Sequence, residues 1–468
     1  MMIRSAPVSD TGLKAFLLAL LLLLPALPGA AQQDGQVRVP IEAAAGIAER
    51  ALLEGQPDLA LQLAKGLLQR DPNDAYAHFI AARALMQLKR PRDGRRAAAL
   101  AYRHARTGME KFQAAQLAAK LSLDGEQAAL AQVWLRRSLL HLPDESYRDR
   151  VIADYKILRR ISPWSVSAQF SLAPSNNLNN GADGPYSLID GLPVVGLLSG
   201  DAQALSGLRA TSNLTFSRRL SGSKTHETRL TGQYYAQRVR LSEDARALAP
   251  GAENSDFAYD HLELGLQHIT DTGDGPLQFE ASAGRSWYGQ SPYQWQYQAG
   301  IGRGFKLSDH AGLRLSAQYE HHVYDSPLLD PIDTLNLRAD YSAKLKSGDR
   351  IGLGLMLSKS QSDTANSRQS RAIGYLGYSL AEPVGPAKLS GRIGASLQRY
   401  PDYAVGFLTV PGGREDRMVF GSVDFSFQKL DYAGFVPTLT LTARKTQSNV
   451  SRFDTNEVSM SFGIRSSF

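Results

Sequence analysis

Cysteine is absent from all 468 residues of this chain. Its absence excludes disulfides, thiol nucleophiles, cysteine-based zinc sites and lipidation at an N-terminal cysteine. Long runs of one charge sign are also missing: 52 basic and 45 acidic residues leave a formal net charge of +7. This mild bias lacks the basic footprint of a nucleic-acid-binding protein, so we expect no nucleic-acid partner.

Long hydrophobic runs are missing beyond the N-terminus. Arg4 and Lys14 precede one apolar run, 15–24, which is followed by a small-residue site at 29–31. This layout predicts a secretory signal peptide over residues 1–31. A membrane anchor is the alternative, but the run has half the roughly twenty residues that a spanning helix needs. Because no other run approaches that length, only a β-barrel could carry the mature chain across a membrane.

Residues 39–160 have the composition and periodicity of helices, being rich in Ala, Leu, Gln and Arg. Ala60 and Ala64 lie one helical turn apart, and Pro72 ends the segment. This spacing fits the later half of a tetratricopeptide repeat, in which small residues let two helices approach closely. Steps of the 34-residue period reach Gly94, Ala98 and Ala128. We expect two or three degenerate repeats in a periplasmic all-α domain.

The end of this helical region carries an apolar stripe beside the pair Arg136–Arg137. The stripe consists of Trp134, Leu135, Leu139 and Leu142. Two interpretations stay open from the sequence. The stripe is either core packing or part of a concave peptide-binding face, which stacked repeats often provide.

From 163 to 468 the periodicity is two, which is the spacing of strands. We predict about fourteen strands, near 164–173, 204–220, 226–240, 257–270, 276–288, 295–306, 310–322, 333–346, 349–360, 370–381, 387–400, 416–429, 436–447 and 455–468. An even number of strands of about ten residues or more is typical of bacterial outer-membrane barrels. Short turns alternate with longer polar loops, as expected when both ends of the barrel domain lie in the periplasm.

The last hairpin, 434–468, shows the alternation most clearly. Val458, Met460 and Phe462 share one face, and Glu457 begins the polar one. A soluble β-sandwich would alternate too, but its strands are usually about five or six residues long. The fold class predicted is therefore α + β with two domains: tetratricopeptide-like helices, then a transmembrane antiparallel barrel of about 14 strands. The terminal Phe468 resembles the signal read by the outer-membrane barrel-assembly machinery.

Few residues could form a catalytic or metal site. His321 and His322 are consecutive on a strand and so point to opposite faces. No motif for a nucleophile, a metalloprotease or a phosphate loop occurs, and Gly352 and Gly354 are interpreted as packing glycines. Lumen-facing cations either tune passage of an acidic solute or pair with carboxylates such as Asp340 and Asp424; these cations are Arg209, Arg338, Lys344, Arg392, Arg444 and Arg465. We expect no enzyme, no cofactor and no metal.

Three motifs together resemble one family. They are Ser162-Pro163-Trp164, the segment SNNLNNG at 175–181, and a closing GF-x-P hairpin with a second Ser-Asn pair. The chain resembles the surface lipoprotein assembly modifiers, the Slam family, over nearly its whole mature length. The positions that carry the likeness are Trp164, Ser175, Asn176, Gly434, Phe435, Pro437, Ser448 and Asn449.

The resemblance implies an outer-membrane translocator with its helical domain in the periplasm. Such a protein delivers client lipoproteins or related secreted proteins to the cell surface. Its partners would be that client, the barrel-assembly machinery and outer-membrane lipid, and the family offers no catalytic residues. The alternatives are an exopolysaccharide export porin, a general solute porin and a barrel-embedded lipid enzyme. Gene neighbourhood would separate these most cheaply.

Overall fold

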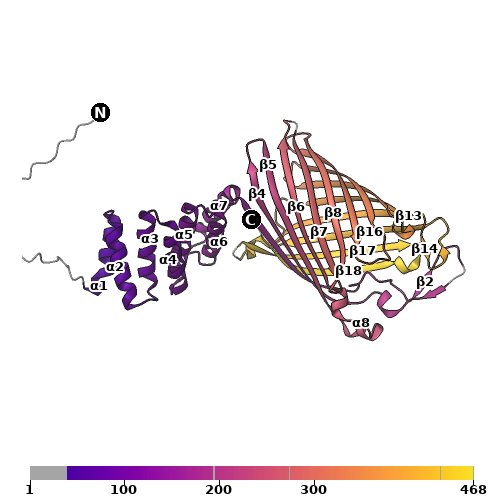
Figure 1. Cartoon of the computed structure of the whole chain (residues 1–468), viewed down its shortest axis with the longest axis horizontal. Helices are drawn as coiled ribbons and strands as arrows, with labels where there is room; N and C mark the ends of the chain where they lie inside the picture. Colours follow the sequence, from indigo (N-terminus) through magenta and orange to yellow (C-terminus); the bar gives the residue numbers. More distant parts are fainter. Residues whose placement is uncertain (1–39, 193–194, 274, 433, 467–468) are drawn as a thin grey trace, which may run out of the picture.

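A computed structural model describes residues 40–192, 195–273, 275–432 and 434–466 of the chain. Within them, a stack of helices leads into a barrel of long strands (Figure 1). The predicted signal peptide, 1–31, and the terminal Phe468 lie outside the described residues. We call the helical stack the arm.

The arm is built from consecutive helices that pack against their neighbours in chain order (Figure 1). None of the helices in the described ranges is long and apolar enough to cross a membrane. The helices are α1 (Ile41–Leu53), α2 (Pro57–Arg70), α3 (Ala75–Gln87), α4 (Pro91–His104), α5 (Gly108–Asp124), α6 (Ala128–Leu139) and α7 (Ser146–Ile161).

Local sequence explains where these helices begin. The Asp74 carboxylate caps α3 by accepting hydrogen bonds from the backbone amides of Tyr76 and Ala77. Thr107 and Glu110 form a reciprocal capping box at the start of α5. Helices α2 and α4 both start on proline, whose missing N–H is no loss at the first helical position.

Small residues set the close packing of the arm. Ala60, Ala64 and Ala98 are fully buried. At Gly94 a Cβ atom would lie 2.9 Å from Leu121 Cδ2, so α4 approaches α5 more closely than a larger residue allows. The tetratricopeptide-like prediction is confirmed. Trp134, Leu135 and Leu139, the main part of the apolar stripe, are buried in the arm's core.

The strands close into one antiparallel barrel of fourteen, as the periodicity predicts. Its order is β1-β18-β17-β16-β13-β12-β11-β10-β9-β8-β7-β6-β5-β4. The bounds are β1 (Trp164–Ser175), β4 (Gly207–Gly222), β5 (His226–Leu241), β6 (Tyr259–Asp271), β7 (Pro276–Tyr288), β8 (Ser291–Lys306), β9 (Ala311–Tyr324), β10 (Ile332–Lys344), β11 (Arg350–Gln361), β12 (Gln369–Ser379), β13 (Lys388–Tyr400), β16 (Arg414–Ser426), β17 (Phe435–Ser448) and β18 (Thr455–Ser466).

The two ends of the barrel differ in their connections. We call the end that joins α7 the arm end and the other the far end (Figure 1). The turns 223–225, 307–310 and 345–349 lie at the arm end. The far end carries the longer loops with their own small elements, namely β2 (Tyr186–Leu188), β3 (Val195–Leu197), η1 (Gly200–Ala202), α8 (Glu243–Leu248), η2 (Asn254–Phe257), η3 (Ala365–Ser367), β14 (Ala404–Val405), β15 (Leu408–Thr409) and η5 (Ser451–Phe453). The remaining short helix, η4 (Gln428–Leu430), lies in an arm-end turn.

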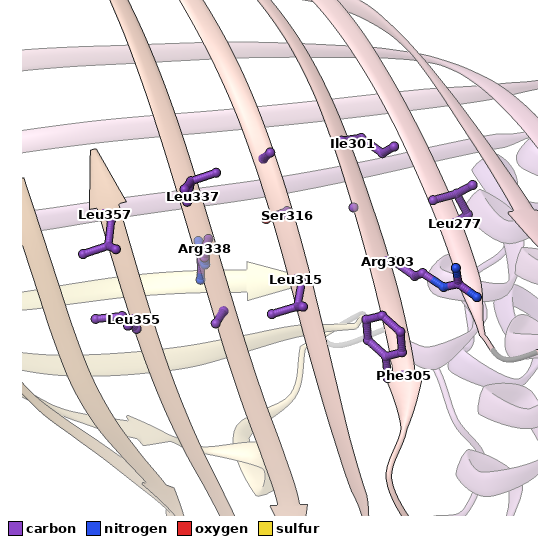
Figure 2. Close-up of a pocket in the computed structure, with 13 residues that line it drawn as sticks. Leu277, Ile301, Arg303, Phe305, Leu315, Ser316, Leu337, Arg338, Leu355 and Leu357 are labelled. Carbon is purple, nitrogen blue, oxygen red and sulfur yellow. The ribbon is translucent and has the colours of Figure 1, made fainter. Parts of the chain in front are cut away.

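The exterior of the barrel is apolar. Leu335 and Leu337 on β10 are 48% and 47% exposed, and Leu355 on β11 is 49% exposed. Figure 2 shows such side chains spread over neighbouring strands around a shallow hollow of about 590 Å³. Exposed leucines on this scale fit acyl chains, not water. This surface is the lipid-facing belt.

On each strand, the residues that alternate with the lipid-facing ones point inward and form a polar lumen wall. Gln298 Nε2 donates to Glu263 Oε2 at 2.6 Å, and Asn336 Nδ2 donates to Glu320 Oε1 at 2.8 Å. Ser358 Oγ in turn donates a hydrogen bond to Asn336 Oδ1 at 2.6 Å. We call these residues the polar girdle. Because they form hydrogen bonds with each other across strands, the girdle stiffens the lumen wall.

Candidate functional site: the two mouths of the barrel

At the arm end, only Ser162 and Pro163 connect α7 to β1. The Ser162 hydroxyl accepts a hydrogen bond from the Trp164 amide at 3.1 Å and donates to the Trp164 carbonyl at 2.8 Å. Arg219 Nη2 on β4 donates to the Ile161 carbonyl at 3.0 Å, which satisfies an orphan carbonyl at the C-terminus of α7. The guanidinium of Arg218 lies 5.1 Å from the centre of the Trp164 ring. The family-like Trp164 therefore belongs to the arm–barrel joint.

A second contact ties the arm to the closing hairpin. Arg136 Nη2 on α6 donates to Ser466 Oγ on β18 at 2.8 Å, and its guanidinium lies 5.1 Å from the centre of the Phe435 ring on β17. The same group donates to Tyr155 Oη on α7 at 2.9 Å, which fixes its direction. We call Arg136, Phe435 and Ser466 the arm clamp. It joins the last helices of the arm to the last two strands of the barrel.

The other family-like residues of this hairpin shape the turn before β17. Gly434 has φ = +82°, a conformation that favours glycine, and its N–H donates to Asp431 Oδ1 at 2.8 Å. Pro437 follows at the edge of the β16 ladder, whose last pair is Ser426–Thr438. A missing N–H is tolerated at such a ladder end. These residues aim Phe435 at the arm.

At the far end, the Ser175–Asn176 pair closes the seam between the first and last strands. The Asn176 side chain copies a backbone pairing: Oδ1 accepts from the Val458 N–H at 3.0 Å, and Nδ2 donates to the Asn456 carbonyl at 2.9 Å. Ser175 Oγ accepts from the Asn177 N–H at 3.1 Å and so turns the chain inward. The pair thus extends the ladder beyond the end of β1.

The Ser448–Asn449 pair does the same at the end of β17. Asn449 Oδ1 accepts from the Glu415 N–H, and Nδ2 donates to the Gly413 carbonyl, both at 2.8 Å. Ser448 Oγ accepts from the Val450 N–H at 3.1 Å. The two Ser-Asn pairs therefore have the same structural role at two strand ends. In each, the serine turns the chain and the asparagine amide hydrogen-bonds to the neighbouring strand.

Asn449→Asp is expected to weaken the far end of the barrel. The carboxylate keeps the acceptor for Glu415 but loses the donor to the Gly413 carbonyl, which costs about 1–3 kcal/mol. Urea unfolding, followed by the heat-modifiable gel shift of the folded barrel, measures this loss. Asn73→Asp, in an exposed turn of the arm, is the matched control. Equal urea midpoints for Asn449→Asp and wild type would show that the hydrogen bond from the Asn449 amide to Gly413 does not stabilise the barrel.

A buried carboxylate holds the loop after β1 against the lumen wall. Glu457 on β18 is 7% exposed. Its oxygens accept from Arg444 Nη2 at 2.6 Å, from Arg209 Nη1 at 3.3 Å and from Ser175 Oγ at 3.2 Å. We call Glu457, Arg209 and Arg444 the mouth tether.

The mouth tether reaches the SNNLNNG segment directly. Arg209 Nη2 donates to the Asn177 carbonyl at 3.1 Å, and Arg444 Nη2 donates to Asn180 Oδ1 at 2.9 Å. Asn177 is 2% exposed, and its side chain exchanges two hydrogen bonds with the Gly181 backbone. Because Arg209 and Arg444 lie on the lumen face of their strands, the segment 177–181 lies inside the far mouth.

The far-end loops form two separate buried clusters, and Leu178 of this segment packs in one of them with Leu205 and Phe257. Ile189, Tyr403, Val410 and Val450 share the other buried cluster. Asp454 lies just before β18: burial raises the pKa of its carboxyl, the Ser448 N–H opposes this, and the carboxylates of Asp183, Asp190 and Asp416 raise the pKa further. A folded-state pKa above the unfolded one stabilises the packed loops at acid pH, and that contribution is lost as the pH rises through the folded value.

The structure also places the other candidate residues. Arg338 pairs with Asp340 at 2.6 Å, as predicted. Asp424 instead accepts from the neutral Thr440 hydroxyl at 2.7 Å. His321 bonds to Asp333 on the lipid-facing side, whereas His322 bonds to Glu320 in the lumen. Within the described ranges, no group of three His, Asp or Glu residues is placed to hold a metal ion.

Sequence reasoning missed the arm clamp and the mouth tether as units. Arg209 and Arg444 carried a signal, since both are predicted to face the lumen. Arg136 was visible only as half of a basic pair beside the apolar stripe. Glu457 was the hardest of these residues to predict, because single carboxylates are common among lumen-facing polar residues.

The architecture defines a class: an outer-membrane-type β-barrel with a tetratricopeptide-like arm at its N-terminus. No protein-family model and no curated protein matches the chain.

Among solved structures, parts of the chain are similar to proteins of two kinds. The first TPR domain of human RPAP3 is 15% identical, with a TM-score of 0.22, over 25% of this chain and 95% of that one. OmpT of Vibrio cholerae is 8% identical over 65% and 97%, with a TM-score of 0.32. The outer-membrane protein Omp33 of Acinetobacter baumannii is 10% identical over 64% and 97%, with a TM-score of 0.31.

Proposed function

We propose that this protein moves specific client proteins through its barrel, from the periplasm to the cell surface, without enzymatic chemistry. The observation that carries the proposal is the arm clamp. Through Arg136, the arm is fixed to the strands that close the barrel. A client held by the arm would therefore be held at the arm-end mouth.

The arm offers a surface suited to an unfolded chain. Apolar side chains are exposed on several of its helices: Met109, Leu123 and Val133 are 49%, 40% and 44% exposed. Exposed apolar groups on a repeat stack are a usual means of peptide capture. In this account the arm lies in the periplasm and delivers the client to the barrel.

The lumen suits passage more than retention. The side chains of the polar girdle are hydrogen-bonded to one another. A peptide that passes through the lumen therefore contacts a polar wall whose donors and acceptors already have partners. The far mouth is held by hydrogen bonds and ion pairs, which can break and re-form. We infer that the mouth tether is the barrier a client displaces.

The resemblance to the Slam family gives the client class: surface lipoproteins or related secreted proteins. The test is co-expression of this chain with a lipoprotein encoded next to it, followed by protease treatment of intact cells. We expect the client to be cleaved only when this chain is present. If the client reaches the surface equally well without it, the proposal is wrong.

The polar girdle also favours a second candidate, an exopolysaccharide export porin. Amide and carboxylate side chains such as Gln298, Asn336 and Glu320 could exchange hydrogen bonds with sugar hydroxyls. That function predicts an open, ion-conducting lumen and a polysaccharide operon nearby. A closed wild-type lumen in bilayer recordings would favour the protein translocator.

A further inference from the structure

The lipid-facing belt carries an unusual group of cations near the far end. Four basic side chains point outward and are exposed within a run of five adjacent strands, of which β12 contributes none: Lys359 on β11, Arg399 on β13, Arg417 on β16 and Lys445 on β17. Each shares parity with exposed apolar residues of its own strand, such as Leu357, Ile393, Val419 and Leu441. We call the four cations the outer basic band.

Strand register brings the band together. Arg399 pairs across β13–β16 with Glu415, Arg417 pairs with Leu397, and Lys445 pairs with Val419. Neighbouring strands lie about 4.8 Å apart, so the band spans roughly 20 Å of the barrel surface. One carboxylate lies among the four cations. Glu415 accepts from Arg399 Nε and Arg417 Nε, both at 2.8 Å, and is shared between them.

Three other basic groups on the belt each have a carboxylate partner. Arg238 pairs with Asp260 at 2.9 Å, Arg285 with Asp325 at 2.7 Å and His321 with Asp333 at 2.7 Å. Those basic groups are matched by carboxylates one to one. The outer basic band has four cations and one carboxylate, so it has positive charge left over for an external anion.

An apolar hollow of about 830 Å³ adjoins the band on its arm-end side. Its lipid-facing floor includes Ile393, Gly421, Val423, Leu441, Val458 and Met460. Gly421 lies between Ile393 and Ala443 in the register, and its missing side chain deepens the hollow. Lys445 is two residues and Arg417 four residues beyond this row, or roughly 7–13 Å along the strands.

We propose that the outer basic band and the hollow form a binding site for the phosphorylated lipid A of the outer leaflet. The cations would bind the glucosamine phosphates, and the hollow would take the acyl chains. Phosphate next to acyl chains is the chemistry that this order of charge and apolar surface complements. The proposal rests on the orientation given above, in which the arm lies in the periplasm and the far end faces the outer leaflet.

The test titrates the full chain in detergent micelles with fluorescent bis-phosphorylated lipid A. Arg417→Gln together with Lys445→Gln removes two charges and leaves shorter polar side chains, and we expect binding to weaken about tenfold or more. Gly421→Leu fills the hollow without altering charge and is expected to weaken binding several-fold. The matched control is Arg238→Gln, a lipid-facing arginine with its own carboxylate, and we expect less than a twofold change.

Glu415→Gln gives an effect of opposite sign, which misfolding cannot imitate. Removing the shared carboxylate frees Arg399 and Arg417, so lipid A should bind a few-fold more tightly. The proposal is overturned if dephosphorylated lipid A binds equally well, or if the Arg417/Lys445 variant binds like wild type. It is also overturned if Arg238→Gln weakens binding as much as that variant, or if millimolar inorganic phosphate displaces lipid A. A heat-modifiable gel shift confirms that each variant is folded. These binding outcomes do not depend on client transport, so they stay the same if the proposed transport function is wrong.

Discussion

Glu457→Ala is expected to open the far mouth of the barrel. The change leaves two lumen arginines, Arg209 and Arg444, without their shared carboxylate. Breaking a buried pair in this way costs about 3 kcal/mol, although the 36% exposure of the Arg444 side chain reduces its share. The segment 177–181 then loses the tether that holds it against the lumen wall. We expect a several-fold rise in single-channel conductance in planar bilayers.

The control for this prediction is a lumen carboxylate on β6, four strands away from β18 in the barrel order. Glu263→Ala removes a carboxylate whose hydrogen-bond donor is the neutral Gln298, so no lumen arginine loses its partner. Its conductance should stay within twofold of wild type. If Glu457→Ala conducts like wild type while remaining folded, the segment 177–181 is not the barrier at the far mouth.

Arg136→Ala is expected to uncouple the arm from the barrel and to reduce client display. The lost hydrogen bond to Ser466 and the lost contact with the Phe435 ring together contribute about 1–2 kcal/mol. That corresponds to a roughly tenfold shift between docked and undocked arm. Protease-accessible client on intact cells is the measurement.

The barrel side of the clamp supplies the partner variant. Phe435→Leu keeps an apolar residue but removes the ring, so it should reduce display in the same direction, and the double variant should lose less than the sum. Arg96→Ala, an exposed arm residue whose side chain is 75% accessible, is the control. Normal display in both clamp variants would mean that the clamp is only a structural contact.

The barrel could be predicted from sequence because its information is local. In β10, the alternation of Leu335 and Leu337 with Asn336 and Arg338 fixes both faces of the strand without reference to any other part of the chain. The same holds for the arm, where Ala60, Ala64 and Gly94 show where helices approach closely.

The mouths could not be predicted, because their contacts join distant parts of the chain. Ser175 and Glu457 are 282 residues apart, and Arg136 and Ser466 are 330 apart. These pairs meet only because β1 closes on β18. The Ser-Asn pairs were visible as a motif, but their role required the register: Asn176 pairs with backbone of β18, which only the closed barrel brings beside it, and Asn449 pairs with backbone of β16, the strand next to β17.

Photo-crosslinking during client display tests the central claim most directly. A photoreactive residue placed at Asn336 faces the lumen, whereas one placed at Leu337, the next residue, faces lipid. If the client passes through the barrel, it crosslinks at position 336 and not at position 337. A displayed client that crosslinks at neither position, or only at 337, would contradict passage through the lumen.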